Sequence, residues 1–101
     1  MDYACITITK RDGSKENFSI EKVERAIAKA YRADGMNDDE TSIKQVTAEV
    51  AAAIDRENIS VEEIQDLVER KLMMRNPSVA KKFIIYREWR TKEREKRTSM
   101  K

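Results

Sequence analysis

The opening of the chain constrains its fold more than any other stretch, because a strand pattern, a turn and a helix cap follow one another directly. Isoleucine and threonine alternate at residues 6–9, as in a strand with one buried face. Asp12 and Gly13 can adopt the positive φ angles of a two-residue hairpin loop, and a second strand is predicted from Lys15. Ser19 can then cap a helix. The sequence predicts a β-hairpin that leads straight into a helix.

Two helices are predicted after the hairpin, because apolar residues recur at three- and four-residue spacing. The first covers residues 20–33 and stops before Gly35, a residue typical of helix ends. The second carries its apolar stripe at residues 43–54, after a cap at Asp39 or Thr41.

Two more helices follow, each with its own start signal. Ser60 and Glu63 have the spacing of a capping box, so the third helix is expected to begin there and to end near Arg75. Asn76 as cap and Pro77 in the first helical position begin the fourth helix. Between the second and third helices, one or two residues around Ile59 could add a strand to the hairpin edge.

These elements predict an α+β fold in which a small hairpin or three-stranded sheet caps a four-helix bundle. A chain of 101 residues supports a single core. We expect residues 1–5 to be a disordered N-terminus, residues 6–90 to form the domain, and residues 91–101 to be a charged helical extension or tail.

Composition excludes several classes of function. The chain has no histidine and one cysteine, so the common Ser-His and Cys-His pairs and the usual zinc ligand sets cannot be assembled. Its two glycines are too few for a glycine-rich phosphate loop or a dinucleotide fingerprint. We therefore expect no catalytic residues and no metal held by protein side chains. No stretch resembles a signal peptide or a membrane span, which predicts a cytoplasmic protein without a membrane partner.

Basic side chains gather where the hairpin meets the first helix. Lys10, Arg11 and Lys22 lie near the helix amino terminus that Ser19 would cap. Basic side chains and a helix amino terminus both favour the binding of an anion such as a triphosphate. The alternative is that these charges only solubilise an exposed turn.

A second basic group lies late in the fourth helix. Arg87 and Arg90 are one helical turn apart and flank Trp89, so they could hold a phosphate or stack on a base. Alternatively they form a solvated helix end whose tryptophan covers the bundle.

Three blocks of the sequence carry a family resemblance. Residues 8–27 (ITKRDGSKENFSIEKVERAI) resemble the opening of the ATP-cone domain, the allosteric nucleotide-binding module of ribonucleotide reductases. Residues 59–69 (ISVEEIQDLVE) resemble its third helix. Residues 79–87 (VAKKFIIYR) resemble its closing helix, and their sequence is most similar to the anaerobic, triphosphate-reducing class. The resemblance implies ATP or dATP as allosteric effector, with Mg²⁺, between a three-stranded sheet and a four-helix bundle.

The resemblance also implies which residues bind the nucleotide. Lys10, Lys22 and Arg87 would meet the phosphates, and the backbone of residues 17–20 with the apolar side of the first helix would face the base. The full implied set is Lys10, Arg11, Glu16, Asn17, Phe18, Ser19, Ile20, Glu21, Lys22, Ser60, Val61, Lys82, Arg87 and Arg90.

Partners follow from the same resemblance. It implies a regulatory domain that acts on a reductase catalytic domain, in cis or in trans, and a nucleotide-dependent change of assembly. The chain stops where a reductase would continue, so an excised domain and a free-standing cone both fit.

Two other functions stay open. One is a nucleic-acid-binding or transcription-regulatory module that uses the basic carboxy-terminal helix, although Glu88, Glu93 and Glu95 dilute its positive charge. The other is a helical protein-interaction domain that takes no small ligand.

Overall fold

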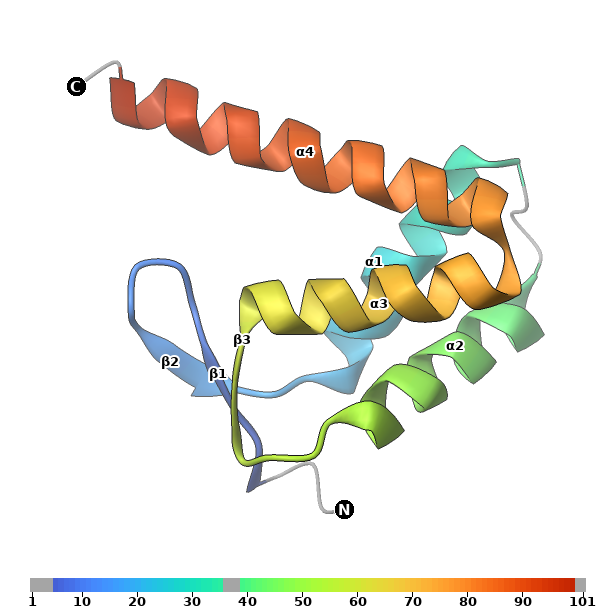
Figure 1. Ribbon diagram of the computed structural model, residues 1–101, viewed down its shortest axis with the longest axis horizontal. Coiled ribbons are helices and arrows are strands. Elements are labelled where there is room, and N and C mark those ends of the chain that lie inside the picture. The colour runs from blue at the N-terminus through green and yellow to red at the C-terminus, as the bar shows by residue number, and fades with distance from the viewer. Residues whose placement is uncertain (1–4, 36–38, 100–101) are drawn as a thin grey trace.

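A three-stranded sheet closes one end of the molecule. The computed structural model describes residues 5–35 and 39–99, with backbone alone at 97–99. The strands are β1 (Thr7–Thr9), β2 (Lys15–Asn17) and β3 (Asn58–Ser60), in the order β2-β1-β3 (Figure 1). β1 runs antiparallel to β2 and parallel to β3, with Ile8 opposite Ile59. The third strand predicted around Ile59 is thus confirmed, and it makes β1 central.

The hairpin turn differs from the predicted two-residue loop. Gly13 has a φ of 88°, but no other residue of the hairpin has a positive φ. The amide of Lys10 donates to the Ser14 carbonyl (2.8 Å), and the Gly13 amide donates to the Lys10 carbonyl (3.0 Å). This is a three-residue loop that ends on a left-handed glycine. Asp12 does not need a positive φ, because its carboxylate instead accepts from the Ser14 amide (2.9 Å) and hydroxyl (2.6 Å).

The first two helices begin at side-chain caps. α1 (Ile20–Ala33) starts after Ser19, whose Oγ accepts from the Lys22 amide. α2 (Glu40–Ala53) starts after Asp39, one of the two predicted caps, whose carboxylate accepts from the Ser42 amide. Both predicted helices are confirmed.

The last two helices also begin where the sequence predicts. α3 (Val61–Arg75) starts from the complete capping box of Ser60 and Glu63, directly after β3. α4 (Pro77–Ser99) is the longest helix of the described chain and continues through the charged residues 91–99. Residues 1–4, which hold most of the segment expected to be disordered, lie outside the described residues.

Each helix packs against two others, so the four form a closed ring in the order α1-α2-α3-α4 (Figure 1). The bundle core consists of Val23, Ile27, Ala30, Tyr31, Ile43, Val46, Val50, Val68, Leu72, Val79, Ala80 and Phe83. A second buried cluster of Ile6, Ile8, Ile54 and Ile59 lies under the sheet. Phe18, Ile64 and Leu67 pack against both clusters and join sheet to bundle. The predicted α+β fold is confirmed.

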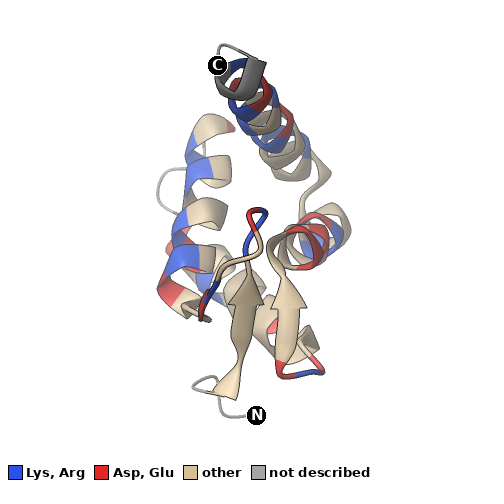
Figure 2. Ribbon diagram, turned by 90° about the vertical axis from the view of Figure 1, so that its left-hand side faces the viewer, with Lys and Arg blue, Asp and Glu red and all other residues tan. Residues whose placement is uncertain are grey.

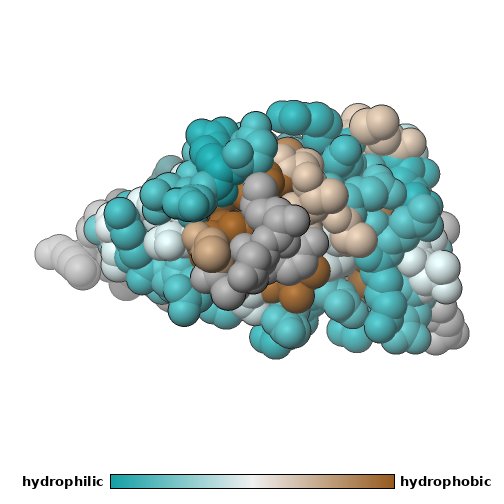
Figure 3. Space-filling view, turned by 90° about the horizontal axis from the view of Figure 1, so that it is seen from below, coloured by the Kyte–Doolittle hydropathy of each residue, from teal (hydrophilic) through white to brown (hydrophobic). Residues whose placement is uncertain are grey.

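The face seen from below is mostly hydrophilic, with patches of apolar residues among the hydrophilic side chains (Figure 3). Trp89 is 55% exposed and does not cover the bundle, contrary to one of the two interpretations of its helix.

No helix within residues 5–35 and 39–99 is both long and apolar enough to cross a membrane.

Candidate functional site

A cavity of about 430 Å³ lies where the hairpin, α1, α3 and α4 meet. Its size falls within the range of small-molecule sites, which is roughly 300–1,000 Å³. The wall combines charged and apolar side chains: Ile8, Arg11, Glu16, Phe18, Ser19, Lys22, Val23, Arg25, Ala26, Lys29, Val61, Ile64, Gln65, Val68, Phe83, Tyr86, Arg87, Arg90 and Arg94. Seven of these residues are basic and one is acidic, so the cavity favours an anion.

Two matching basic stripes face each other across this cavity. Each stripe has the spacing i, i+3, i+7, which places three side chains on one face of a helix. Figure 2 shows lysine and arginine along α1 and α4, with the hairpin turn between them. The residues of the two stripes are Lys22, Arg25 and Lys29 on α1, and Arg87, Arg90 and Arg94 on α4.

Glu16, the acidic residue of the cavity wall, lies between two lysines. Its Oε2 is 3.4 Å from Lys22 Nζ and 3.9 Å from Lys10 Nζ. The Lys22 and Lys10 side chains are 62% and 48% exposed, and ion pairs this exposed contribute little to stability. Both lysines are therefore available to an incoming anion.

The amino terminus of α1 also borders the cavity. Ser19 Oγ accepts from the Lys22 amide (3.4 Å) and donates to Glu21 Oε2 (3.1 Å). The first amides of a helix carry a partial positive charge, so this helix end adds to the field of the lysines.

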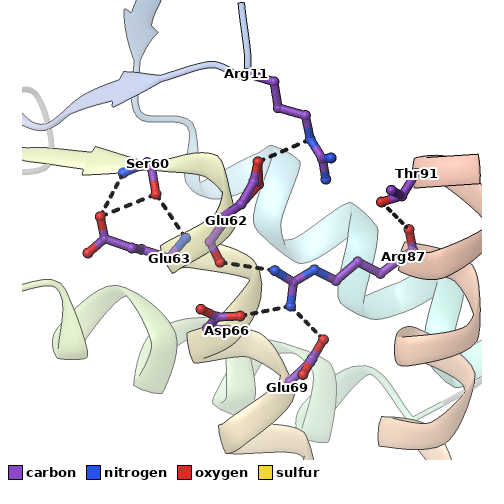
Figure 4. Close-up of polar contacts among 8 residues, drawn as sticks. All are labelled: Arg11, Ser60, Glu62, Glu63, Asp66, Glu69, Arg87 and Thr91. Carbon is purple, nitrogen blue, oxygen red and sulfur yellow. Dashed lines mark hydrogen bonds and ion pairs between the residues drawn. The ribbon is translucent and has the colours of Figure 1, made fainter. Parts of the chain in front are cut away.

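Arg87 is the most constrained cation of the wall. Its Nη1 donates to Asp66 Oδ1 (2.8 Å) and Glu69 Oε1 (2.6 Å) on α3, and its Nη2 donates to the Glu62 carbonyl (3.4 Å), as Figure 4 shows. The side chain is 20% exposed. Partial burial acts to lower the pKa of Arg87, but the hydrogen bonds to Glu69 and Asp66 outweigh it and raise the pKa above its ordinary value. Arg87 therefore stays charged, as arginine does in proteins generally.

Arg11 makes the corresponding contact from the hairpin turn. Its Nε lies 3.1 Å from Glu62 Oε1, at the start of α3 (Figure 4). Arg11 also borders a smaller adjoining cavity of about 300 Å³, whose other wall residues are Lys10, Asp12, Val61 and Arg94. The two cavities share Arg11, Val61 and Arg94 and therefore lie next to each other.

Part of the wall is apolar. Val23 and Ala26 of α1, Ile64 of α3 and Phe83 of α4 line it, and all four belong to the bundle core or pack against it. Within the described residues, Gln65 Oε1 is buried and has no hydrogen-bond partner. A buried polar atom without a partner is costly, and Gln65 is one of the residues that line the cavity.

Comparison of the sequence with known protein families identifies the family of this chain. The profile of the ATP cone domain matches residues 6–92, which is most of the chain. This chain belongs to the ATP-cone family. The sequence resemblance is therefore confirmed, and so is its general meaning, an allosteric nucleotide-binding domain related to the regulatory regions of ribonucleotide reductases.

Relatives of this ATP cone include several classes of reductase. The chain is 39% identical over 97 residues to the anaerobic ribonucleoside-triphosphate reductase of Haemophilus influenzae, covering 92% of the chain and 14% of that protein. It is 36% identical over 100 residues to ribonucleoside-diphosphate reductase subunit alpha of Chlamydia pneumoniae, covering 88% of the chain and 10% of that protein. It is 38% identical over 102 residues to the vitamin B12-dependent ribonucleoside-diphosphate reductase of Thermoplasma acidophilum, covering 92% and 13%. The chain thus spans a small fraction of these relatives.

The cavity of this cone brings together more than half of the residues expected to bind. The predicted residues in its wall are Arg11, Glu16, Phe18, Ser19, Lys22, Val61, Arg87 and Arg90. Lys10 borders the smaller cavity. The predicted residues outside both walls are Asn17, Ile20, Glu21, Ser60 and Lys82. Ser60 is engaged in the capping box instead.

The sequence alone did not identify all the residues of the cavity wall. The charged and polar residues that it missed are Arg25, Lys29, Gln65 and Arg94. The signal for the cations was present, because the i, i+3, i+7 spacing of basic residues occurs in both helices. This spacing indicates a shared binding site only when α1 and α4 are known to be neighbours. No such signal marks Gln65.

A metal site made by protein side chains is not found in the described part of the cone, where no group of three or more Asp, Glu, Cys or His side chains is placed to hold an ion.

Proposed function

We propose that this chain binds one adenine nucleotide, ATP or dATP, in the cavity between the hairpin, α1, α3 and α4, and that it acts as a regulatory rather than a catalytic unit. The observation that carries the proposal is the wall itself, which has basic stripes on two facing helices and an apolar region between them. Nucleotides combine a polyanionic tail with a flat apolar base. The basic stripes suit the tail, and the apolar region suits the base.

The triphosphate is assigned to the basic end of the cavity. Lys22 and the amino terminus of α1 would meet it from one side, and Arg87 and Arg90 from the other. Arg11, and Lys10 from the adjoining cavity, would approach from the hairpin turn. Arginine suits paired phosphate oxygens, whereas lysine contributes a point charge. Mg²⁺ would arrive with the nucleotide and be held mainly by its phosphates, as is usual for this ion.

The base is assigned to the apolar end of the cavity. Val23 and Ala26 on α1 and Phe83 on α4 offer it a dry surface. Gln65 also lines the cavity, and its buried Oε1 would accept a hydrogen bond from an exocyclic amino group such as that of adenine if the side chain turned toward the ligand.

Regulation requires a partner, which we propose is a reductase catalytic domain in the same or another chain. The relatives named above are reductases, and each is many times longer than this chain. A nucleotide would control that partner only by binding more tightly to one arrangement of the cone than to another. A change of assembly is the form of response that we propose.

Calorimetric titration of the chain with ATP-Mg and dATP-Mg tests the proposal. Saturable binding of both nucleotides is expected. Melting gives a second readout, because ligand at about a hundredfold its dissociation constant adds roughly 2.7 kcal/mol of stability. Heats at the level of buffer and an unmoved melting temperature with millimolar nucleotide would overturn the proposal and favour an interaction domain without a small ligand.

A further inference from the structure

Three acidic residues of α3 form a stripe that faces the cavity arginines. Glu62, Asp66 and Glu69 have the spacing i, i+4, i+7 and therefore share one side of the helix. Glu62 lies 3.1 Å from Arg11, while Asp66 and Glu69 lie 2.8 and 2.6 Å from Arg87 (Figure 4). The stripe thus occupies two cations that belong to the cavity wall.

Carboxylate and phosphate oxygens compete for the same donors. A guanidinium pairs with either group through charged hydrogen bonds, and its donors are limited in number and direction. Arg87 directs Nη1 at two carboxylates and Nη2 at the Glu62 carbonyl, so its principal donors already point at α3. These contacts engage three of its five N–H groups, so a phosphate that pairs with Nη1 must draw it away from a carboxylate of α3.

We propose that the acidic stripe of α3 is an internal competitor for the phosphates of the nucleotide, so that binding exchanges protein carboxylates for phosphate at Arg87 and Arg11. This inference rests on the proposed function and adds a regulatory element to the same site. The stripe lowers the affinity of the cavity for a triphosphate and makes that affinity depend on the position of α3.

The exchange also explains how occupancy would reach the rest of the fold. The Arg87 ion pairs join α4 to α3, and the Arg11 ion pair joins the hairpin turn to α3. When phosphate withdraws the arginines, Asp66 and Glu69 lose their partners and face a nearby polyanion of like charge. The resulting repulsion favours movement of α3 away from α4. The two positions of α3 then differ in their interaction with the nucleotide, and allosteric control needs such a difference.

A charge-removing double variant tests the competition. Asp66→Asn with Glu69→Gln keeps the side-chain shapes but removes both negative charges from Arg87. We expect its ATP-Mg dissociation constant, measured by calorimetry, to fall about tenfold, because the phosphates no longer displace an ion pair. The affinity for adenosine should stay unchanged, since adenosine carries no phosphate.

Glu49→Gln is the matched control. It breaks another interhelical ion pair of α3, in which Arg75 Nη2 lies 3.0 Å from Glu49 Oε2, and neither residue borders the two cavities. The control should bind ATP-Mg as the unaltered chain does. If the double variant folds poorly by circular dichroism, the single variant Asp66→Asn leaves Glu69 on Arg87 and should give a smaller gain in the same direction.

The outcomes separate this inference from the proposed function. Unchanged or weaker ATP binding by a folded variant would overturn the inference and make the carboxylates positioning groups for Arg87, while the proposed function would stand. An equal gain with adenosine would also overturn it, because the effect would then not concern phosphate. Absence of ATP binding by the unaltered chain would overturn the proposed function and the inference together.

Discussion

Lys29 Nζ lies 5.7 Å from the centroid of the Tyr86 ring, so a cation of α1 meets an aromatic ring of α4 at the cavity. Trp89 stacks on the same ring, with centroids 6.3 Å apart and planes inclined by 27°. The contact joins the two helices that carry the basic stripes. It also places an aromatic face beside the site proposed for a nucleotide.

Tyr86→Leu removes this aromatic contact while leaving an apolar side chain. Exposed cation–π contacts are worth about 0.5–1 kcal/mol, and Tyr86 is 37% exposed. We expect the free energy of unfolding, from urea titration, to fall by about 1 kcal/mol or less. Tyr86→Phe retains the ring and is the control, so an equal loss in both variants would show that the hydroxyl, and not the ring face, carries the effect.

Lys10→Ala and Lys22→Ala should each weaken ATP-Mg binding about tenfold, because each removes a charged partner of the phosphates. Neither variant should shift the melting temperature appreciably, since both side chains are largely exposed. The measurement is calorimetry, with circular dichroism to monitor folding.

Lys44→Ala provides the matched control for the lysine variants. Lys44 is 62% exposed, like Lys22, and is likewise paired with a glutamate, but it lies on α2 away from the cavity. If nucleotide affinity falls equally in the Lys22 and Lys44 variants, the loss comes from the change in net charge. That result would contradict the proposed placement of the phosphates.

The helices were predictable because their signals are local. The Ser60 capping box and the Asn76-Pro77 start each fix a helix end within a few residues, and both agree with the structure. The hairpin loop was predicted less well, because Asp-Gly is typical of two-residue loops but a left-handed glycine can also close a three-residue loop. The hydrogen bonds of Asp12 to Ser14 select the longer one.

The site was predictable only where it is continuous in sequence. The segment that holds Arg11, Glu16 and Lys22 was found because the hairpin and the start of α1 are adjacent along the chain. Arg25 and Arg94 belong to the site only because α1 packs beside α4, a relationship between residues far apart in sequence. The ion pairs of Arg87 with α3 could not be anticipated for the same reason.

Gln65→Leu should change stability and binding in opposite directions. Removing a buried oxygen without a partner relieves a cost that is typically about 1–3 kcal/mol, so the free energy of unfolding should rise. ATP binding should weaken, because the base loses the acceptor assigned to it. Chemical denaturation and calorimetry on the same sample give both values, and a leucine variant that binds ATP with unaltered affinity would remove Gln65 from the proposed site.

Gly13→Ala tests how the hairpin loop is held. Gly13 has a φ of 88°, and an added Cβ would meet no atom within 4 Å, so backbone strain is the whole cost. Left-handed backbone costs an ordinary L-residue roughly 1–2 kcal/mol, whereas asparagine tolerates it better. We expect Gly13→Ala to lower the free energy of unfolding by about that amount in urea titration, and Gly13→Asn to lower it less. Because the same loop places Arg11 in the cavity wall, the alanine variant should also weaken ATP binding. Equal stability in the two variants would contradict the left-handed loop.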